Sequence, residues 1–147
     1  MILGTVVALS SGIALVVEIV AGRMLAPYVG MSLYTWTAVI ATVLAGLSIG
    51  NFLGGLLYEH AQSRKNTVVM SFSLALAALT TSAAPWVLQK NGPTLVNEDA
   101  PVFSIVALCV SVFFIPSLAM GIVSPIATSM AQDKSKKPAV ILGLFFA

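Results

Sequence analysis

The sequence predicts an all-α protein, a polytopic transmembrane helix bundle with four full spans, a truncated fifth and a cytoplasmic N-terminus. Hydrophobic residues make up 59% of the 147 residues and charged residues only 8%, whereas soluble domains have about 25% charged residues. The seven basic and five acidic residues also fall in clusters. The apolar stretches between these clusters are close to the ~20 residues that a helix needs to cross a bilayer.

Four apolar stretches are expected to form the spans of a single transmembrane domain that covers residues 1–147. They comprise residues 2–21, 34–58, 67–88 and 102–124. The first stretch lacks the basic start of a signal peptide and its apolar part is longer than is typical, so we expect a retained helix. A partial helix over 139–147 is too short to span. We favour a fifth helix truncated there over a segment that lies at the interface.

Basic residues set the expected orientation. Arg64 and Lys65 lie between the second and third stretches, and Lys134, Lys136 and Lys137 follow the fourth. Since Lys and Arg collect in cytoplasmic loops, we expect both of these connections and the N-terminus to be inside. The chain is then a multi-pass protein of the cell membrane, and we expect the bacterial inner membrane.

The two outer loops are expected over residues 22–33 and 89–101. Arg23, in the first of them, is the one charge that opposes the assignment. Aromatic side chains favour the membrane interface, and four of them mark the outer boundary: Tyr28, Tyr34, Trp36 and Trp86.

Small residues are expected to join the helices, because apolar burial does not drive helices together in lipid. In the second stretch they recur every four residues, at Ala38, Thr42, Gly46, Gly50 and Gly54. In the third stretch they follow one face, at Ser71, Ala75, Ala78 and Ser82. We therefore expect the second helix to pack against the third, with dimerisation through the three glycines as the alternative.

Pro116 is expected to kink the fourth helix, because proline removes an intrahelical hydrogen bond. Ser117, Gly121 and Ser124 lie close by and can satisfy freed carbonyls or allow close contact. Two interpretations stay open, a kink that borders a cavity and a kink that is only structural.

Glu18 is the strongest candidate for a functional side chain. A carboxylate at membrane depth costs about 2.5–3.5 kcal/mol on insertion scales, so it usually faces other helices or water. Helical geometry gives it a small, polar face shared with Ser11, Ala14, Ala21 and Gly22. One interpretation is a proton-coupled or cation-binding carboxylate. The other is a carboxylate tied to Arg23 or to backbone amides.

Arg23 and Asn51 complete the candidate intramembrane polar site. Arg23 is five residues after Glu18, about 140° around the helix. The two can meet only if the helix unwinds before Pro27, since proline disfavours helical geometry in the preceding residue. Asn51 lies about 100° from Gly50 and can bond to another helix or contact a ligand.

The sequence predicts no catalytic, cofactor-binding or metal-binding residues, and no cofactor. Cys109 and His60 are the only residues of their types, so a cysteine cluster or a histidine pair cannot form. Serine and threonine have no basic partner nearby for nucleophilic catalysis. A net charge of +2 without a basic stripe gives no sign of nucleic-acid binding. The expected partners are the lipid bilayer and other membrane helices, in a homo-oligomer or a larger complex.

An ordered set of short strings between residues 11 and 126 resembles the membrane half of the membrane-bound spermidine synthase-like proteins, the major facilitator–spermidine synthase fusions. The strings are Ser11-Gly12, Leu15-Val16-Val17-Glu18, Arg23-Met24-Leu25-Ala26-Pro27, Gly30, Ser32, Tyr34-Thr35-Trp36, Leu44 to Asn51, Gly54-Gly55, Met120-Gly121 and Ser124-Pro125. The positions that the resemblance carries over are Glu18, Arg23, Pro27, Gly30, Trp36, Asn51, Gly54 and Gly55.

The resemblance implies a membrane module that precedes or accompanies a soluble aminopropyltransferase-like domain, which would bind decarboxylated S-adenosylmethionine and a diamine. Such a domain is not part of this sequence. We therefore expect an anchor or scaffold for that domain or partner. The alternatives are an accessory subunit of a larger membrane complex and a half-transporter for a small cation or polyamine that uses Glu18.

Overall fold

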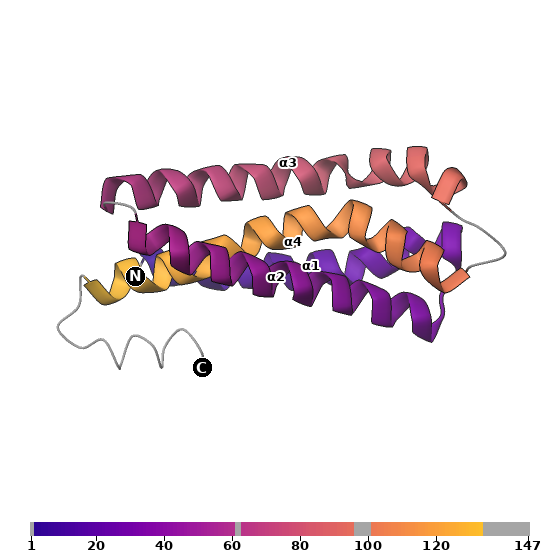
Figure 1. Cartoon of the computed structure of the whole chain (residues 1–147), viewed down its shortest axis with the longest axis horizontal. Helices are drawn as coiled ribbons and strands as arrows, with labels where there is room; N and C mark the ends of the chain where they lie inside the picture. Colours follow the sequence, from indigo (N-terminus) through magenta and orange to yellow (C-terminus); the bar gives the residue numbers. More distant parts are fainter. Residues whose placement is uncertain (1, 61–62, 96–100, 134–147) are drawn as a thin grey trace.

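A computed structural model describes residues 2–60, 63–95 and 101–133, and all regular structure in these residues is α-helical (Figure 1). The helices are α1 (Ile2–Val29), α2 (Leu33–His60), α3 (Ser63–Leu95) and α4 (Pro101–Asp133). Each is long and apolar enough to cross a membrane, over Ala8–Val29, Leu33–Glu59, Asn66–Thr94 and Val102–Met130. The all-α class and four membrane-length helices are confirmed. The fifth helix predicted over 139–147 lies outside the described residues.

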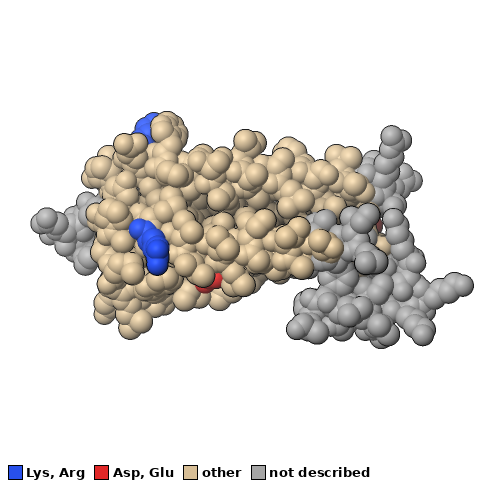
Figure 2. Space-filling model, turned by 180° about the vertical axis from the view of Figure 1, so that it is seen from behind, with Lys and Arg blue, Asp and Glu red and all other residues tan. Residues whose placement is uncertain are grey.

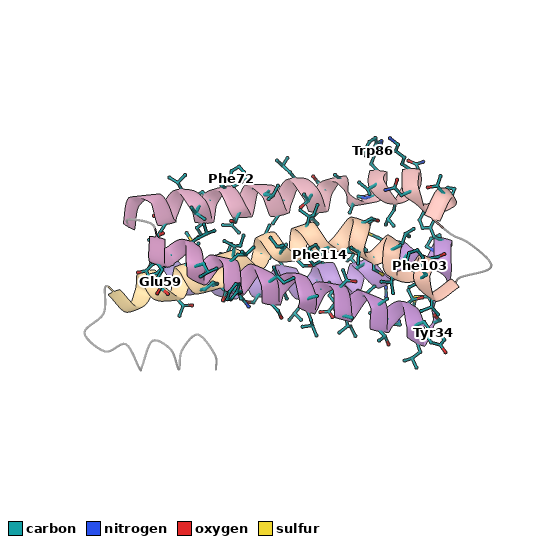
Figure 3. The ribbon with its side chains drawn as sticks, viewed as in Figure 1. Tyr34, Glu59, Phe72, Trp86, Phe103 and Phe114 are labelled. Atoms are coloured by element: carbon teal, nitrogen blue, oxygen red, sulfur yellow. The ribbon has the colours of Figure 1, made fainter. Side chains whose placement is uncertain are left out.

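Successive helices run in opposite directions along one bundle axis (Figure 1). The start of α1, the end of α2, the start of α3 and the end of α4 lie at one end, labelled by Glu59 in Figure 3. The α1–α2 turn lies at the other end, labelled by Tyr34 and Trp86 (Figure 3). We call these the Glu59 end and the Tyr34 end. The sequence analysis predicts that the Glu59 end is cytoplasmic.

Apolar side chains cover most of the outside of the bundle. Figure 2 shows one face on which uncharged residues predominate and charged residues are few. Exposed large apolar residues come from all four helices and include Leu15, Ile19, Phe52, Phe72, Leu79 and Val110. In water such a surface would be strongly unfavourable, whereas in hydrocarbon it has no such cost. The surface therefore matches the lipid environment that the composition predicts.

Helix α4 is the centre of the bundle and contacts the other three helices. Half of the residues in its most apolar window (50%) are buried, against 17% in the windows of α1 and α3. Its fully buried side chains include Leu108, Phe113, Pro116 and Val123. Because α4 fills the middle, the other helices are held chiefly by their contacts with it.

The glycine stripe of α2 faces α4, so the predicted pairing of the second helix with the third is wrong. The closest approach is at Gly50, where a Cβ atom would meet the carbonyl oxygen of Leu118 and lie 2.9 Å from the Cα of Gly121. Gly46 and Gly54 lie against α4 in the same way. The Ser117 to Pro125 segment of α4 gives α2 a small-residue surface that α3 does not match, and α2 and α4 share the largest interface of the bundle.

The small-residue face predicted for α3 is not its packing face. Ser71, Ala75, Ala78 and Ser82 are all exposed. The buried side of α3 instead comprises Asn66, Ser73, Ala77, Ala84, Leu88 and Gly92. This side packs because Leu88 and Ala84 join the apolar core formed by α1, α2 and α4, and helix geometry then turns the opposite small residues outwards.

Helix α1 extends eight residues beyond the predicted boundary at 21, through Pro27 to Val29, so the loop predicted over 22–33 is mostly helical. Within a helix, proline removes the hydrogen bond of its own nitrogen and its ring crowds the carbonyl four residues earlier, yet α1 continues for two residues beyond Pro27. The helix stops at Gly30, whose φ of +75° suits glycine and whose N–H donates to the Ala26 carbonyl at 3.0 Å. Ser32 then caps α2, accepting a 3.2 Å hydrogen bond from the Thr35 N–H.

Helix α3 also extends beyond its predicted end at residue 88, since residues 89–95 are helical where a loop was expected. Packing explains the extension. Gly92 is buried against the ring of Tyr28 from α1, which a Cβ atom at residue 92 would overlap. One turn earlier, the Lys90 ammonium lies 5.4 Å from the ring centroid of Trp86, a cation–π distance. The contact of Tyr28 with Gly92 joins the last turns of α1 and α3 at the Tyr34 end, whereas the contact of Lys90 with Trp86 lies within α3.

Candidate intramembrane polar site

A cavity of about 350 Å³ lies between α1, α2 and α4, and two of the three candidate polar residues, Glu18 and Asn51, line it. Helix α1 contributes Ser10, Ser11, Ala14, Leu15 and Glu18, helix α2 contributes Val43, Leu44, Leu47 and Asn51, and helix α4 contributes Met120, Gly121 and Ser124. The cavity is partly open on its side. It is thus a groove with one carboxylate, one amide and three hydroxyls in an otherwise apolar lining.

Glu18 lies at the middle of the membrane-length part of α1, as the eleventh of the 22 residues in Ala8–Val29. Its side chain is half-buried and lines the cavity. Ser11 lies seven residues earlier, about 10 Å nearer the Glu59 end of the helix. The cavity therefore runs from a central carboxylate towards hydroxyls at the Glu59 end.

Asn51 reaches the same cavity from α2, on an exposed position next to buried Gly50. The close contact of Gly50 with Gly121 fixes its place, since a Cβ atom on Gly121 would lie 3.1 Å from the Asn51 backbone nitrogen. Ser124 follows one turn along α4 and also lines the cavity. The glycines predicted for helix packing thereby position Asn51 and Ser124 beside the cavity.

Arg23 is not part of this site. It is exposed, it does not line the cavity, and among the described residues no ion pair joins it to Glu18. The helix remains regular through Pro27, so the unwinding that would bring the two side chains together does not occur. The interpretation of Glu18 as a carboxylate tied to Arg23 has no structural basis.

On the Tyr34 side of the cavity, α1, α2 and α4 pack tightly against one another. The main core cluster joins Ala21 and Leu25 of α1 to Val39 of α2 and Leu108 and Phe113 of α4. All five side chains are at most 2% exposed. In addition, a Cβ atom on Gly22 would lie 3.0 Å from the ring of Trp36, so the ring covers this side of α1. The polar cavity ends against this packing.

Pro116 lies in the fourth helix at the mouth of a separate, apolar crevice of about 190 Å³ between α1, α3 and α4. The helix is continuous through it. The same crevice contains Thr81, whose buried hydroxyl oxygen has no hydrogen-bond partner in the described chain. The sequence analysis did not single out Thr81, since a threonine among alanines carries no signal of where its hydroxyl will point.

The cavity suits a singly charged cation better than a metal ion. In the part of the chain that the structure describes, no group of three His, Cys, Asp or Glu side chains is arranged to hold a metal. Calcium takes six to eight oxygen ligands and magnesium six, whereas the lining offers a single carboxylate among Leu15, Leu44 and Leu47. No lining residue is basic, so an anion has no counter-charge.

Comparison with family models, curated proteins and solved structures finds no match to the chain.

Some of the short strings quoted in the sequence analysis contribute residues to the cavity, whereas those over residues 23–36 and 54–55 do not line it. The contributing residues are Ser11, Leu15, Glu18, Leu44, Leu47, Asn51, Met120, Gly121 and Ser124. These segments are separated by up to about a hundred residues in the sequence, and they belong to three different helices. Their convergence on one groove relates them to a common site.

Proposed function

We propose that the chain is an integral membrane module that anchors an aminopropyltransferase-like domain or partner at the cytoplasmic face of the cell membrane, as expected of the spermidine synthase-like proteins. The membrane would be a bacterial inner membrane. Four apolar helices of membrane length support the membrane part of the proposal. The resemblance of residues 11–126 supports the choice of partner.

The observation that supports this proposal is the alternating direction of the four helices in the described residues. It puts the start of α1 and the end of α4 at the Glu59 end, where α2 also passes into α3 (Figure 1). Arg64 and Lys65 lie in the first turn of α3, next to the α2–α3 connection, and three lysines follow α4 in the sequence. Because basic connections remain in the cytoplasm, a domain attached after α4 or a partner bound to these connections would lie there.

Membrane fractionation tests the anchor. The chain would be co-expressed with the aminopropyltransferase-like protein of its own genome, and an unrelated four-span protein would serve as the control. We expect the soluble protein to sediment with membranes only when the chain is present. If it stays in the supernatant with either membrane protein, the anchor proposal is wrong.

An accessory subunit of a larger membrane complex is the second candidate. It is favoured by the exposed small-residue face of α3, comprising Ser71, Ala75, Ala78 and Ser82, since such faces allow helices to approach closely. Ala75→Leu would then release the partner in mild detergent, whereas Phe52→Ala, at an exposed apolar position of α2, would not. A partner-free, monodisperse preparation of the unaltered chain would argue against this candidate.

The third sequence-based candidate is a half-transporter for a small cation or polyamine. It is favoured by the position of Glu18 in the cavity. Its binding step can be tested separately from transport.

A further inference from the structure

We propose that the cavity between α1, α2 and α4 binds a small primary alkylammonium ion, with Glu18 as its counter-charge and its entry from the Glu59 half of the bundle. This inference does not rest on the anchor function; it rests on the third candidate's use of Glu18 and specifies the class of cation that would bind. A chain that anchors nothing could still bind the cation, and an anchor need not bind one.

The charge of the ligand follows from the lining. Glu18 is the one ionisable side chain among the residues that form the cavity, and among the described residues it has no ion-pair partner. An unpaired carboxylate at membrane depth is costly, so such a group usually faces water, a cavity or a partner charge. A cation in the cavity would supply the missing charge.

The aliphatic character of the ligand follows from the cavity walls. Leu15, Val43, Leu44, Leu47 and Met120 form most of the surface near the carboxylate. A volume of about 350 Å³ lies at the lower end of the roughly 300–1,000 Å³ range of small-molecule sites. A bare inorganic ion would leave most of this space empty, whereas an alkyl chain of a few carbons would contact the leucines.

The primary ammonium group follows from the polar atoms. It has three N–H donors, and the cavity offers the Glu18 carboxylate as the charged acceptor. The amide of Asn51 and the hydroxyls of Ser11 and Ser124 lie towards the Glu59 end. They can hydrate or bond the ligand as it enters.

The direction of entry follows from the packing difference between the two halves. Leu25 and Val39 are 0% exposed, and the Trp36 ring closes over Gly22 on the Tyr34 side of Glu18. On the other side the polar side chains continue for about two helical turns, from Glu18 to Ser11. These polar side chains favour entry of a cation from the Glu59 half over entry through the packed contacts of α1 with α2 and α4.

Calorimetric titration of the purified chain in nanodiscs of uncharged phosphatidylcholine tests the proposal, with n-butylammonium chloride as the probe. Butyrate and n-butanol, which have the same chain length, test the need for positive charge. We expect saturable binding of butylammonium alone. Glu18→Gln should weaken it at least tenfold, which corresponds to about 1.4 kcal/mol. Glu59→Gln, which removes an exposed carboxylate outside the cavity, should leave it unchanged.

A second variant separates loss of charge from loss of space. Leu44 lines the cavity and is 55% exposed, so Leu44→Trp can fill the opening without overpacking the core. It should abolish binding while Glu18 remains in place. Circular dichroism and gel filtration would show that each variant is folded.

Several outcomes would overturn the proposal. Equal binding by the unaltered chain and by folded Glu18→Gln would show that the carboxylate is not the counter-charge. If butanol binds as tightly as butylammonium, the site is an apolar crevice that does not select for charge. If sodium ions displace butylammonium and bind with the same affinity, the site is one for inorganic cations. If the folded, unaltered chain binds no probe and Glu18→Gln changes only its oligomeric state, the carboxylate faces another helix.

Discussion

The contact between α2 and α4 depends on the absence of a side chain at Gly50. A Cβ atom there would overlap the carbonyl oxygen of Leu118 and lie 2.9 Å from the Cα of Gly121. These are backbone atoms of the central helix, so they cannot move aside as the end of a flexible side chain would. Gly50→Ala must therefore push two helices apart.

The magnitude can be estimated against a matched glycine. Overpacking by one methyl group typically costs about 1–3 kcal/mol, while alanine is favoured over glycine in a helix by about 1 kcal/mol. At Gly55, in the same helix, a Cβ atom would meet nothing within 4 Å. We therefore expect Gly55→Ala to be neutral or stabilising, and Gly50→Ala to be less stable than Gly55→Ala by about 2 kcal/mol or more.

Titration with dodecyl sulfate in mixed micelles would measure the free energy of unfolding, with helix content followed by circular dichroism. The comparison of the two alanine variants cancels most of the helix propensity difference. Equal free energies for Gly50→Ala and Gly55→Ala would refute the close approach of α2 to α4. The arrangement of Asn51 and Ser124 around the cavity would then have to be abandoned as well.

Two further predictions concern the cap of α2 and the openness of the cavity. Ser32→Ala removes the acceptor of the hydrogen bond from the Thr35 N–H. It should lower the free energy of unfolding by about 1 kcal/mol in the same titration. The control is Ser111→Ala, which removes a hydroxyl that bonds only to its own helix and should change the free energy by less than half as much. Asn51→Cys, in a Cys109→Ala background, should react with an impermeant thiol reagent in inside-out vesicles but not in right-side-out vesicles. Butylammonium should slow this reaction. Labelling in right-side-out vesicles alone would contradict the predicted orientation.

The sequence was sufficient to predict the class of the fold and the number of membrane-length helices. Charge is scarce and clustered, and a bilayer requires helices of a certain length, so these properties depend on composition and spacing alone. The start of α2 was also predicted to within one residue, at 34 against Leu33. Ser32 helps to fix that start by capping the helix.

The helix ends at the Tyr34 end were not predictable in the same way. Pro27 and Pro93 are local signals for a break, yet α1 and α3 continue through both. What stabilises the extra turns is contact between residues far apart in the sequence, such as Tyr28 on Gly92. Local propensity is a weak predictor where packing of this kind opposes it.

The sequence was equally unable to predict which helix packs against the glycine stripe of α2. A run of small residues at four-residue spacing predicts that another helix approaches closely, but it does not specify which helix. Both α3 and α4 offered small residues, and only the three-dimensional arrangement puts Ser117 and Gly121 opposite Gly46 and Gly50. The sequence predicts one polar site that comprises Glu18, Arg23 and Asn51, and the packing of α2 on α4 puts only Glu18 and Asn51 on the same cavity.

The position of Glu18 fits the difference between the two halves of the bundle. At the centre of α1 it lies where the packed core around Leu25 gives way to the polar cavity. A carboxylate one or two turns closer to the Tyr34 end would be enclosed by apolar side chains, where an unpaired charge is most costly. At its actual depth it borders the polar side chains that continue into the Glu59 half. A domain held at the Glu59 end, as proposed for the anchor, would therefore cover the end from which a cation is proposed to enter. Binding of such a partner should slow the exchange of the cation without changing the residues that hold it.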